Sequence, residues 1–184
     1  MKQLIEKVKK NKHTIGVVGL GYVGLPLCLR MINKRIKVVG VDNDQKKINN
    51  LHSGISYISD IKNSDLKYFK KNKFRFSDNY EILKKSDVII ICLPTPLKNN
   101  KPDLSYLIKS FKQISNILSK NKVVILESTV YPGATEELSK IIPKKYKIGK
   151  DIFICYSPER ENPGDNSFTY NTTPKIISGM TKNC

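Results

Sequence analysis

Short apolar runs alternate with longer amphipathic segments along most of the chain. The alternation becomes regular from Thr14, and glycine, proline, asparagine and aspartate separate the segments. The apolar runs are rich in valine and isoleucine and are too short for helices, so they are typical of strands that are buried on both faces. The predicted strands are Ile15–Gly19, Ile36–Val41, a weaker one at Phe74–Phe76, Val88–Leu93, Val123–Leu126, Ile152–Tyr156 and Lys175–Ser178.

The amphipathic segments between these runs predict helices. Asp103 and Ser105 both offer side-chain oxygens that can cap the start of the fourth of them. Strands and helices in alternation imply right-handed crossovers and a parallel sheet. The pattern therefore predicts an α/β fold, doubly wound, with a mostly parallel sheet and helices on both faces. The predicted helices are about Tyr22–Asn33, Asp44–Leu51, Tyr80–Lys85, Leu104–Leu118 and Thr135–Ile142.

The domain organisation follows from length and from the start of the regular pattern. A chain of 184 residues suits one domain and leaves little for a second. Residues 1–13 are expected to form a basic, helical N-terminal extension, and residues 14–184 the single α/β domain. In the extension, Leu4, Ile5 and Val8 would share one side of a short helix.

The expected compartment is the cytoplasm. A lysine-rich start precedes the uncharged stretch His13–Leu29, which could pass for a signal peptide, but four glycines and a proline interrupt it. At 17 residues this stretch is also short for a membrane span, so no membrane partner is expected. The cysteines form no CxxC pair and show no metal-ligand spacing, which suits buried thiols in a reducing compartment and predicts no metal site. They are Cys28, Cys92, Cys155 and Cys184.

The net charge of +17 raises nucleic acid as a possible partner. The kind of basic residue argues against a nucleic-acid partner, because the basic residues are nearly all lysines spread along the whole chain. Base readout and bidentate phosphate contacts favour arginine. The chain has only Arg30, Arg35, Arg75 and Arg160, so a solvated basic surface is the favoured interpretation.

A glycine loop at the end of the first predicted strand provides the main candidate site. Gly19, Gly21 and Gly24 form a G-x-G-x-x-G at the junction with a helix. The first glycine permits the tight turn, the second lets a pyrophosphate approach the backbone, and the third lets the helix pack against the sheet. The amides of Tyr22 and Val23 would then face the phosphates at the positive end of the helix. A purely structural tight turn is the alternative.

Asp42 supplies the acid that a dinucleotide site needs. It ends the second predicted strand, 23 residues after Gly19. Its carboxylate would accept hydrogen bonds from the adenosine ribose and repel a 2′-phosphate, so NAD is favoured over NADP. The neighbouring Lys46 and Lys47 leave that preference open.

Several motifs resemble those of the UDP-glucose/GDP-mannose dehydrogenase family and follow one another in the same order as in that family. They are Gly19–Leu27, Pro94–Leu97, Pro102–Ser105, Glu127–Gly133 and Ser157–Arg160, and together they extend the likeness over nearly everything from Ile15 to Gly179. The stretch Ser157–Gly164 most resembles the branch that acts on UDP-N-acetylhexosamines, especially UDP-N-acetylglucosamine. The resemblance implies a Rossmann-like NAD-binding domain of a nucleotide-sugar 6-dehydrogenase.

Resemblance to this family implies oxidation of a sugar C6 alcohol to a carboxylate by two NAD molecules in turn, for surface polysaccharide precursors. A cysteine thiol captures the aldehyde, and the thioester that results is hydrolysed. The partner is then a UDP-sugar, and the full-length enzyme is expected to be a homodimer or larger. UDP-glucose, UDP-N-acetylgalactosamine and UDP-N-acetylmannosamine stay open as substrates.

The same resemblance assigns roles to residues beyond the glycine loop. Lys47 corresponds to a weaker ribose contact, and Pro94, Thr95 and Ser128 to residues that line the cofactor. Thr129 corresponds to a threonine that lines the cofactor and helps hold a catalytic water. A threonine that merely caps a turn is the alternative.

Glu159 corresponds to the glutamate associated with thioester hydrolysis, where a carboxylate can act as the base. A surface loop acid is the alternative. With Arg160 and Glu161 it would also contact the substrate, although Arg160 could instead pair with Glu161. The UDP-glucose branch has a second glutamate four residues after the first, and Pro163 occupies that position here. A catalytic role for Glu161 is therefore doubtful.

Other expected parts of such an enzyme do not match this sequence. The family's nucleophilic cysteine lies in a glycine-rich loop, and its central helical region carries a lysine and an asparagine, none of which is found here. The domain that binds UDP also has no counterpart. We expect a cofactor-binding domain that does not turn over UDP-sugars alone. A different Rossmann dehydrogenase and a non-catalytic NAD-binding module are the alternatives.

Overall fold

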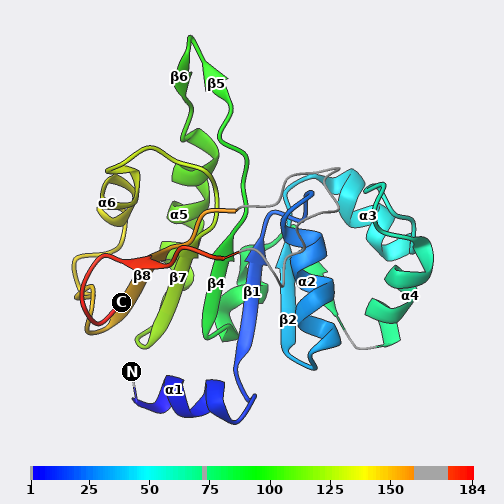
Figure 1. Ribbon diagram of the computed structural model, residues 1–184, viewed down its shortest axis with the longest axis horizontal. Coiled ribbons are helices and arrows are strands. Elements are labelled where there is room, and N and C mark those ends of the chain that lie inside the picture. Colours follow the sequence, from blue (N-terminus) through cyan, green and yellow to red (C-terminus); the bar gives the residue numbers. More distant parts are fainter. Residues whose placement is uncertain (1, 72–73, 160–173) are drawn as a thin grey trace.

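The computed structural model of the protein describes residues 2–71, 74–159 and 174–184. Within those ranges a seven-stranded sheet has the order β3-β2-β1-β4-β7-β8-β9 (Figure 1). Every pairing in it is parallel except that of β9, which runs antiparallel to β8. The strands are β1 (Thr14–Val18), β2 (Lys37–Val41), β3 (Arg75–Ser77), β4 (Val88–Ile91), β7 (Lys122–Leu126), β8 (Ile152–Tyr156) and β9 (Ser178–Gly179).

Helices cover both faces of this sheet, as the sequence predicted. Successive side chains of a strand point to opposite faces, so Ile89 and Ile91 of β4 pack into one core and Ile90 into the other. The first core is closed by α5, α6 and η1, and the second by α2, α3 and α4. The elements are α1 (Lys2–Lys9), α2 (Gly24–Asn33), α3 (Gln45–Ser53), α4 (Asn63–Lys71), the 3₁₀ helix η1 (Tyr80–Lys85), α5 (Ser105–Ile117) and α6 (Ala134–Ser139).

Two peripheral features complete the chain. The strands β5 (Leu97–Lys98) and β6 (Lys101–Pro102) form a small antiparallel hairpin that stands away from the body of the molecule (Figure 1). Helix α1 lies beneath the sheet, where Leu4 is buried while Ile5 and Val8 are exposed. No helix in the described ranges is both long and apolar enough to cross a membrane.

The predicted buried strand at Lys175–Ser178 is wrong. The structure has only the two residues of β9, which pair with the end of β8 at the edge of the sheet. Ile176 and Ile177 lie outside the strand and are exposed. In sequence these apolar residues resemble a core strand, but within the described residues no layer packs over them.

The helices also differ from the prediction in several places. The sequence analysis missed α4, although Leu66 and Phe69 lie on its buried side. The segment Tyr80–Lys85 forms a 3₁₀ helix, in which the Asn79 side chain accepts a hydrogen bond from the amide of Glu81. Helix α6 ends at Ser139 instead of Ile142 because i→i−3 turns replace the α-helical bonds there.

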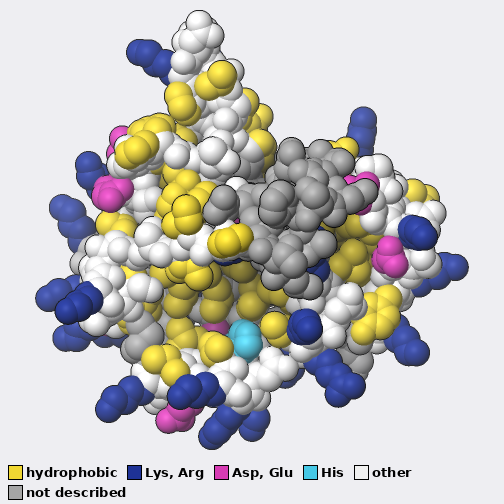
Figure 2. Space-filling view, in the orientation of Figure 1, with side chains coloured by type: hydrophobic (Ala, Val, Ile, Leu, Met, Phe, Trp, Pro, Cys, Tyr) yellow, Lys and Arg dark blue, Asp and Glu magenta, His cyan; other side chains and the backbone are white. Residues whose placement is uncertain are grey.

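Lysine and arginine side chains are spread around the visible face of the molecule instead of gathering in one patch (Figure 2). Hydrophobic side chains are visible in the middle of the same face. The net charge is therefore distributed over a solvated periphery on this side.

Candidate functional site

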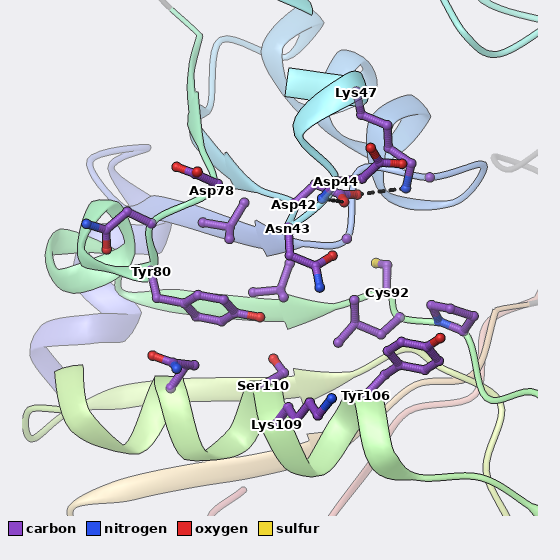
Figure 3. Close-up of a pocket in the computed structure, with 18 of the residues that line it drawn as sticks. Asp42, Asn43, Asp44, Lys47, Asp78, Tyr80, Cys92, Tyr106, Lys109 and Ser110 are labelled. Carbon is purple, nitrogen blue, oxygen red and sulfur yellow. Dashed lines mark hydrogen bonds and ion pairs between the residues drawn. The ribbon is translucent and has the colours of Figure 1, made fainter. Parts of the chain in front are cut away.

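A cleft of about 890 Å³ opens at the carboxyl ends of the central strands. It lies where β1 and β4 are neighbours, so that the chain winds away in opposite directions on the two sides. Ligands of open α/β sheets bind at such a switch point, and the volume is typical of ligand pockets. The lining comes from the ends of β1, β2 and β4, from η1 and from one side of α5 (Figure 3).

Glycine occupies the three positions of the loop for different reasons. Gly19 has a φ of +91°, and a Cβ there would lie 2.4 Å from the carbonyl oxygen of Cys92. At Gly24 a Cβ would lie 1.8 Å from the carbonyl oxygen of Gly19, so only glycine lets α2 start this close to the strand. Among the described residues, and apart from its chain neighbours, a Cβ at Gly21 meets no atom within 4 Å. The fold does not require glycine there, and the open space faces the cleft.

The start of α2 presents its amides without a side-chain cap. Val23 is the N-cap residue and makes no capping side-chain hydrogen bond. The first backbone bond of this turn joins the amide of Leu25 to the carbonyl of Gly21 at 3.1 Å. Tyr22 lies beside them and is 66% exposed. Uncapped amides and the positive end of the helix suit an anionic diphosphate, so Gly21, Tyr22 and Val23 lie where the sequence predicted phosphate contacts.

Asp42 is buried at the end of β2 and does more than the sequence analysis expected. Its Oδ2 accepts hydrogen bonds from the amide of Leu20 at 2.8 Å and from Lys47 Nζ at 3.0 Å. Its Oδ1 accepts from the amide of Asp44 at 2.9 Å. The carboxylate therefore ties the glycine loop to the start of α3. Because each carboxylate oxygen has two acceptor positions, one position on Oδ1 is left for a ribose hydroxyl.

Two further residues, which the sequence analysis did not find, also shape the site. The Tyr57 hydroxyl donates to the carbonyl of Leu20 at 2.7 Å and so holds the glycine loop from the other side. Tyr80 projects across the cleft toward Ser110 of α5 (Figure 3). Burial raises the pKa of Tyr80, and the charge of Asp42 adds to the rise. Neither tyrosine belongs to a motif, so only the folded chain identifies them.

The predicted contacts after β4 and β7 are brought together. The amide of Leu93 donates to Ser128 Oγ at 3.0 Å, and Thr95 Oγ1 donates to the carbonyl of Thr129 at 2.6 Å. Pro94 lines the cleft, and Thr129 is exposed. Ser128 and Thr95 thus hold the two loops against each other, a role that their prediction as cofactor contacts did not include.

Glu159 lies directly beside this pair of loops. Its amide donates to the carbonyl of Glu127 at 3.1 Å, which places it just beyond the end of β8. Glu127 is buried and forms an ion pair with Lys175. Although Glu127 stands in one of the motifs, its carboxylate was not among the predicted site residues. Arg160 and Glu161 lie outside the described residues.

Three of the four thiols are poor nucleophiles. All four cysteines are free. Burial raises the pKa of Cys28 far above its ordinary value and that of Cys155 to about 11. Burial, together with the charge of Glu127, also raises the pKa of Cys92. A thiol must ionise to attack a carbonyl, so these three are suited to packing. In the same ranges no three His, Cys, Asp or Glu side chains are grouped to hold a metal.

Comparisons with known proteins agree with this geometry. Residues 13–184 match the model of the UDP-glucose/GDP-mannose dehydrogenase family, NAD binding domain. Protein CapL of Staphylococcus aureus is 43% identical over 173 residues, which cover 92% of this chain and 40% of CapL. The UDP-N-acetyl-D-glucosamine 6-dehydrogenase of Pseudomonas aeruginosa is 42% identical over 171 residues, 91% of this chain and 40% of that protein.

Among solved structures, the UDP-D-ManNAc dehydrogenase of Pyrococcus horikoshii is similar with a TM-score of 0.80 at 33% identity. The match covers 92% of this chain and 41% of that one. The chain thus spans about two fifths of the length of these relatives. It belongs to the UDP-glucose/GDP-mannose dehydrogenase family, whose members are NAD-dependent enzymes, and matches the NAD-binding domain of that family.

Proposed function

We propose that this chain is the cofactor-binding part of a cytoplasmic UDP-N-acetylhexosamine 6-dehydrogenase that oxidises the C6 alcohol of UDP-N-acetylglucosamine to a carboxylate. The observation that carries the proposal is the open space at Gly21, between the uncapped start of α2 and Asp42. The relative from P. aeruginosa, which is named for this substrate, supports the choice of sugar. UDP-N-acetylmannosamine is the alternative, because the P. horikoshii relative is named for it.

The residues of the cleft divide the work of holding NAD. The amides of Gly21, Tyr22 and Val23 bind the diphosphate, and Asp42 accepts hydrogen bonds from the adenosine ribose. When bound, NAD supplies the acceptor for the hydride that leaves the sugar. The residues of the cleft would orient the cofactor.

The environment of Asp42 supports NAD over NADP. A buried carboxylate repels the 2′-phosphate of NADP, and the nearest lysine, Lys47, is already paired with it at 3.0 Å. Lys47 is therefore held by Asp42 and is not placed to favour a second phosphate.

Thr129 and Glu159 are proposed to act at the reacting carbon. They follow β7 and β8, which are neighbouring parallel strands, so both lie at the same edge of the sheet. A threonine hydroxyl can hold a water in place, and a carboxylate can take its proton during hydrolysis. The raised pKa values of the buried thiols give them no part in the covalent step. We therefore expect this chain to bind NAD without oxidising UDP-sugars.

Calorimetric titration of NAD and NADP tests the cofactor assignment. We expect the wild-type chain to bind NAD more tightly than NADP. Asp42→Asn should weaken NAD about tenfold, because a hydrogen bond to a charged group contributes about 1.5–3 kcal/mol. Asp60→Asn is the matched control, since Asp60 is exposed and outside the cleft. Equal affinity of the wild type for both cofactors would show that Asp42 is not the ribose acid.

A further inference from the structure

Leu20, in the middle of the glycine loop, is held at three points. Its amide donates to Asp42 Oδ2 at 2.8 Å, and its carbonyl accepts from the Tyr57 hydroxyl at 2.7 Å. Its side chain is fully buried and lies over Gly40 of β2, where a Cβ would come within 2.8 Å of it. The backbone on both sides of Leu20 therefore has little freedom to rotate.

Tyr57 reaches this carbonyl from another part of the chain. It lies between α3 and α4, 37 residues after Leu20. Its ring packs against the core that α2, α3 and α4 close. Burial raises the pKa of its hydroxyl, and the charge of Asp42 adds to the rise, so the hydroxyl keeps its proton and can donate. The core thus sets the position of this donor.

The hydrogen bond from Tyr57 also sets the direction of the next amide. A trans peptide group carries its carbonyl and its N–H on opposite sides, and the described residues contain no cis peptide bond. Since the Leu20 carbonyl is directed at Tyr57, the N–H of Gly21 is directed away from it. Gly21 lines the cleft, whereas Tyr57 does not. In the described ranges the Gly21 amide donates no hydrogen bond.

We infer that Tyr57 is a positioning residue for the cofactor: by holding the Leu20 carbonyl, it directs the Gly21 amide into the cleft toward the diphosphate. This inference rests on the proposed function, because it takes the ligand to be a dinucleotide. A loop that is ordered before binding loses less conformational freedom when the ligand arrives. The Tyr57 hydroxyl therefore strengthens binding without touching the ligand, and only ligands with a diphosphate gain from it.

Tyr57→Phe tests this role, because it removes the hydroxyl and keeps the ring. Calorimetry should show that NAD and ADP bind about fivefold more weakly, as the loss of one neutral hydrogen bond from a binding site does. Adenosine, followed by NMR titration, should bind the variant and the wild type equally. It carries the ribose that Asp42 would hold but no diphosphate for the Gly21 amide.

Tyr146→Phe is the matched control. The Tyr146 hydroxyl donates to the carbonyl of Leu118, also at 2.7 Å, and its ring packs against the other core. Both variants should lose a similar free energy of unfolding in urea, because each loses one hydrogen bond of the same kind. Only Tyr57→Phe should lose affinity for NAD and ADP, which separates positioning from a purely structural role.

A second measurement needs no variant. In the wild-type chain, ADP should shift the amide signal of Gly21 and adenosine should not. Equal shifts with the two ligands would overturn the inference.

The outcomes with the variant separate this inference from the proposed function. Normal NAD affinity in Tyr57→Phe, beside a wild type that binds NAD, would overturn the positioning role and leave the proposed function standing. Equal losses for NAD and adenosine would also overturn it, because the hydroxyl would then support the cleft as a whole. A wild-type chain that binds none of these ligands would contradict the proposed function and the inference with it.

Discussion

Two glycines of the same loop, Gly21 and Gly24, are needed for different reasons. Gly24 is required by the fold, because a Cβ there would meet the backbone oxygen of Gly19 at 1.8 Å. At Gly21 a Cβ would meet nothing within 4 Å in the part of the chain that the structure describes, so these residues tolerate a side chain where the proposed diphosphate does not. The G-x-G-x-x-G motif assigns the two glycines different roles, and the packing shows the structural role of Gly24.

We therefore expect Gly24→Ala and Gly21→Ala to differ in kind. Gly24→Ala should lower the free energy of unfolding by about 3 kcal/mol, as overpacking against rigid backbone does. Gly21→Ala should change that free energy by less than about 0.5 kcal/mol but weaken NAD binding at least about tenfold. Urea denaturation and calorimetry of both variants measure the two effects. A Gly21→Ala chain that binds NAD normally would contradict the diphosphate assignment.

The sequence predicted the glycine loop and Asp42 but not the contacts that hold them. Motif positions are recognisable because the ligand dictates their residue types. Tyr57 and Glu127 bond to groups that are distant in sequence, the carbonyl of Leu20 and the amide of Glu159. Nothing along the chain marks such pairs, since their partners meet only when β1, β7 and β8 are in one sheet.

At the level of elements, hydrophobic period predicted the core strands because each is buried on both faces. It failed where an apolar run lacks a covering layer, at Ile176 and Ile177, and where a helix is mostly polar. Helix α4 is a mostly polar segment of nine residues, in which Leu66 and Phe69 are buried. Hydrophobic periodicity reflects which side chains are buried. Burial in turn depends on elements that lie outside the short stretch of sequence in which the period is read.

A salt bridge joins α1 to the lower end of the sheet. Asp87, just before β4, accepts hydrogen bonds from Lys7 Nζ at 2.7 Å and from the amide of Thr14 at 3.0 Å. Burial alone would raise the pKa of Asp87, but these bonds and the charges of Lys7 and Lys122 lower it below its ordinary 3.8. The ionised form is thus favoured by folding. Its contribution is fully present above about pH 3.8 and is lost as pH falls through the lower, folded value.

Asp87→Asn should therefore cost about 1 kcal/mol of unfolding free energy at pH 7, as loss of a hydrogen-bonded surface ion pair does. The difference from the wild type should shrink below pH 3.8. Urea denaturation at several pH values measures it, with Asp60→Asn as the exposed control. A difference that persists unchanged at pH 2.5 would refute the electrostatic explanation.

For the whole molecule, position in the sheet explains why the candidate site is where it is. The ends of β1, β2, β4, β7 and β8 bring the glycine loop, Asp42 and Glu159 to one edge, although more than a hundred residues separate the first from the last. The chain matches about two fifths of the length of its relatives. The family likeness indicates NAD, and the cleft at the switch point suits a dinucleotide.

The most direct test of the account is an amide NMR titration of the chain with NAD. We predict that the signals of Gly21, Tyr22, Val23 and Gly24 shift the most, together with those around Asp42, and that the same amount of NADP shifts them less. If NAD leaves these amides unmoved, or shifts signals only away from the start of α2, the dinucleotide site is not where the structure indicates and the account fails.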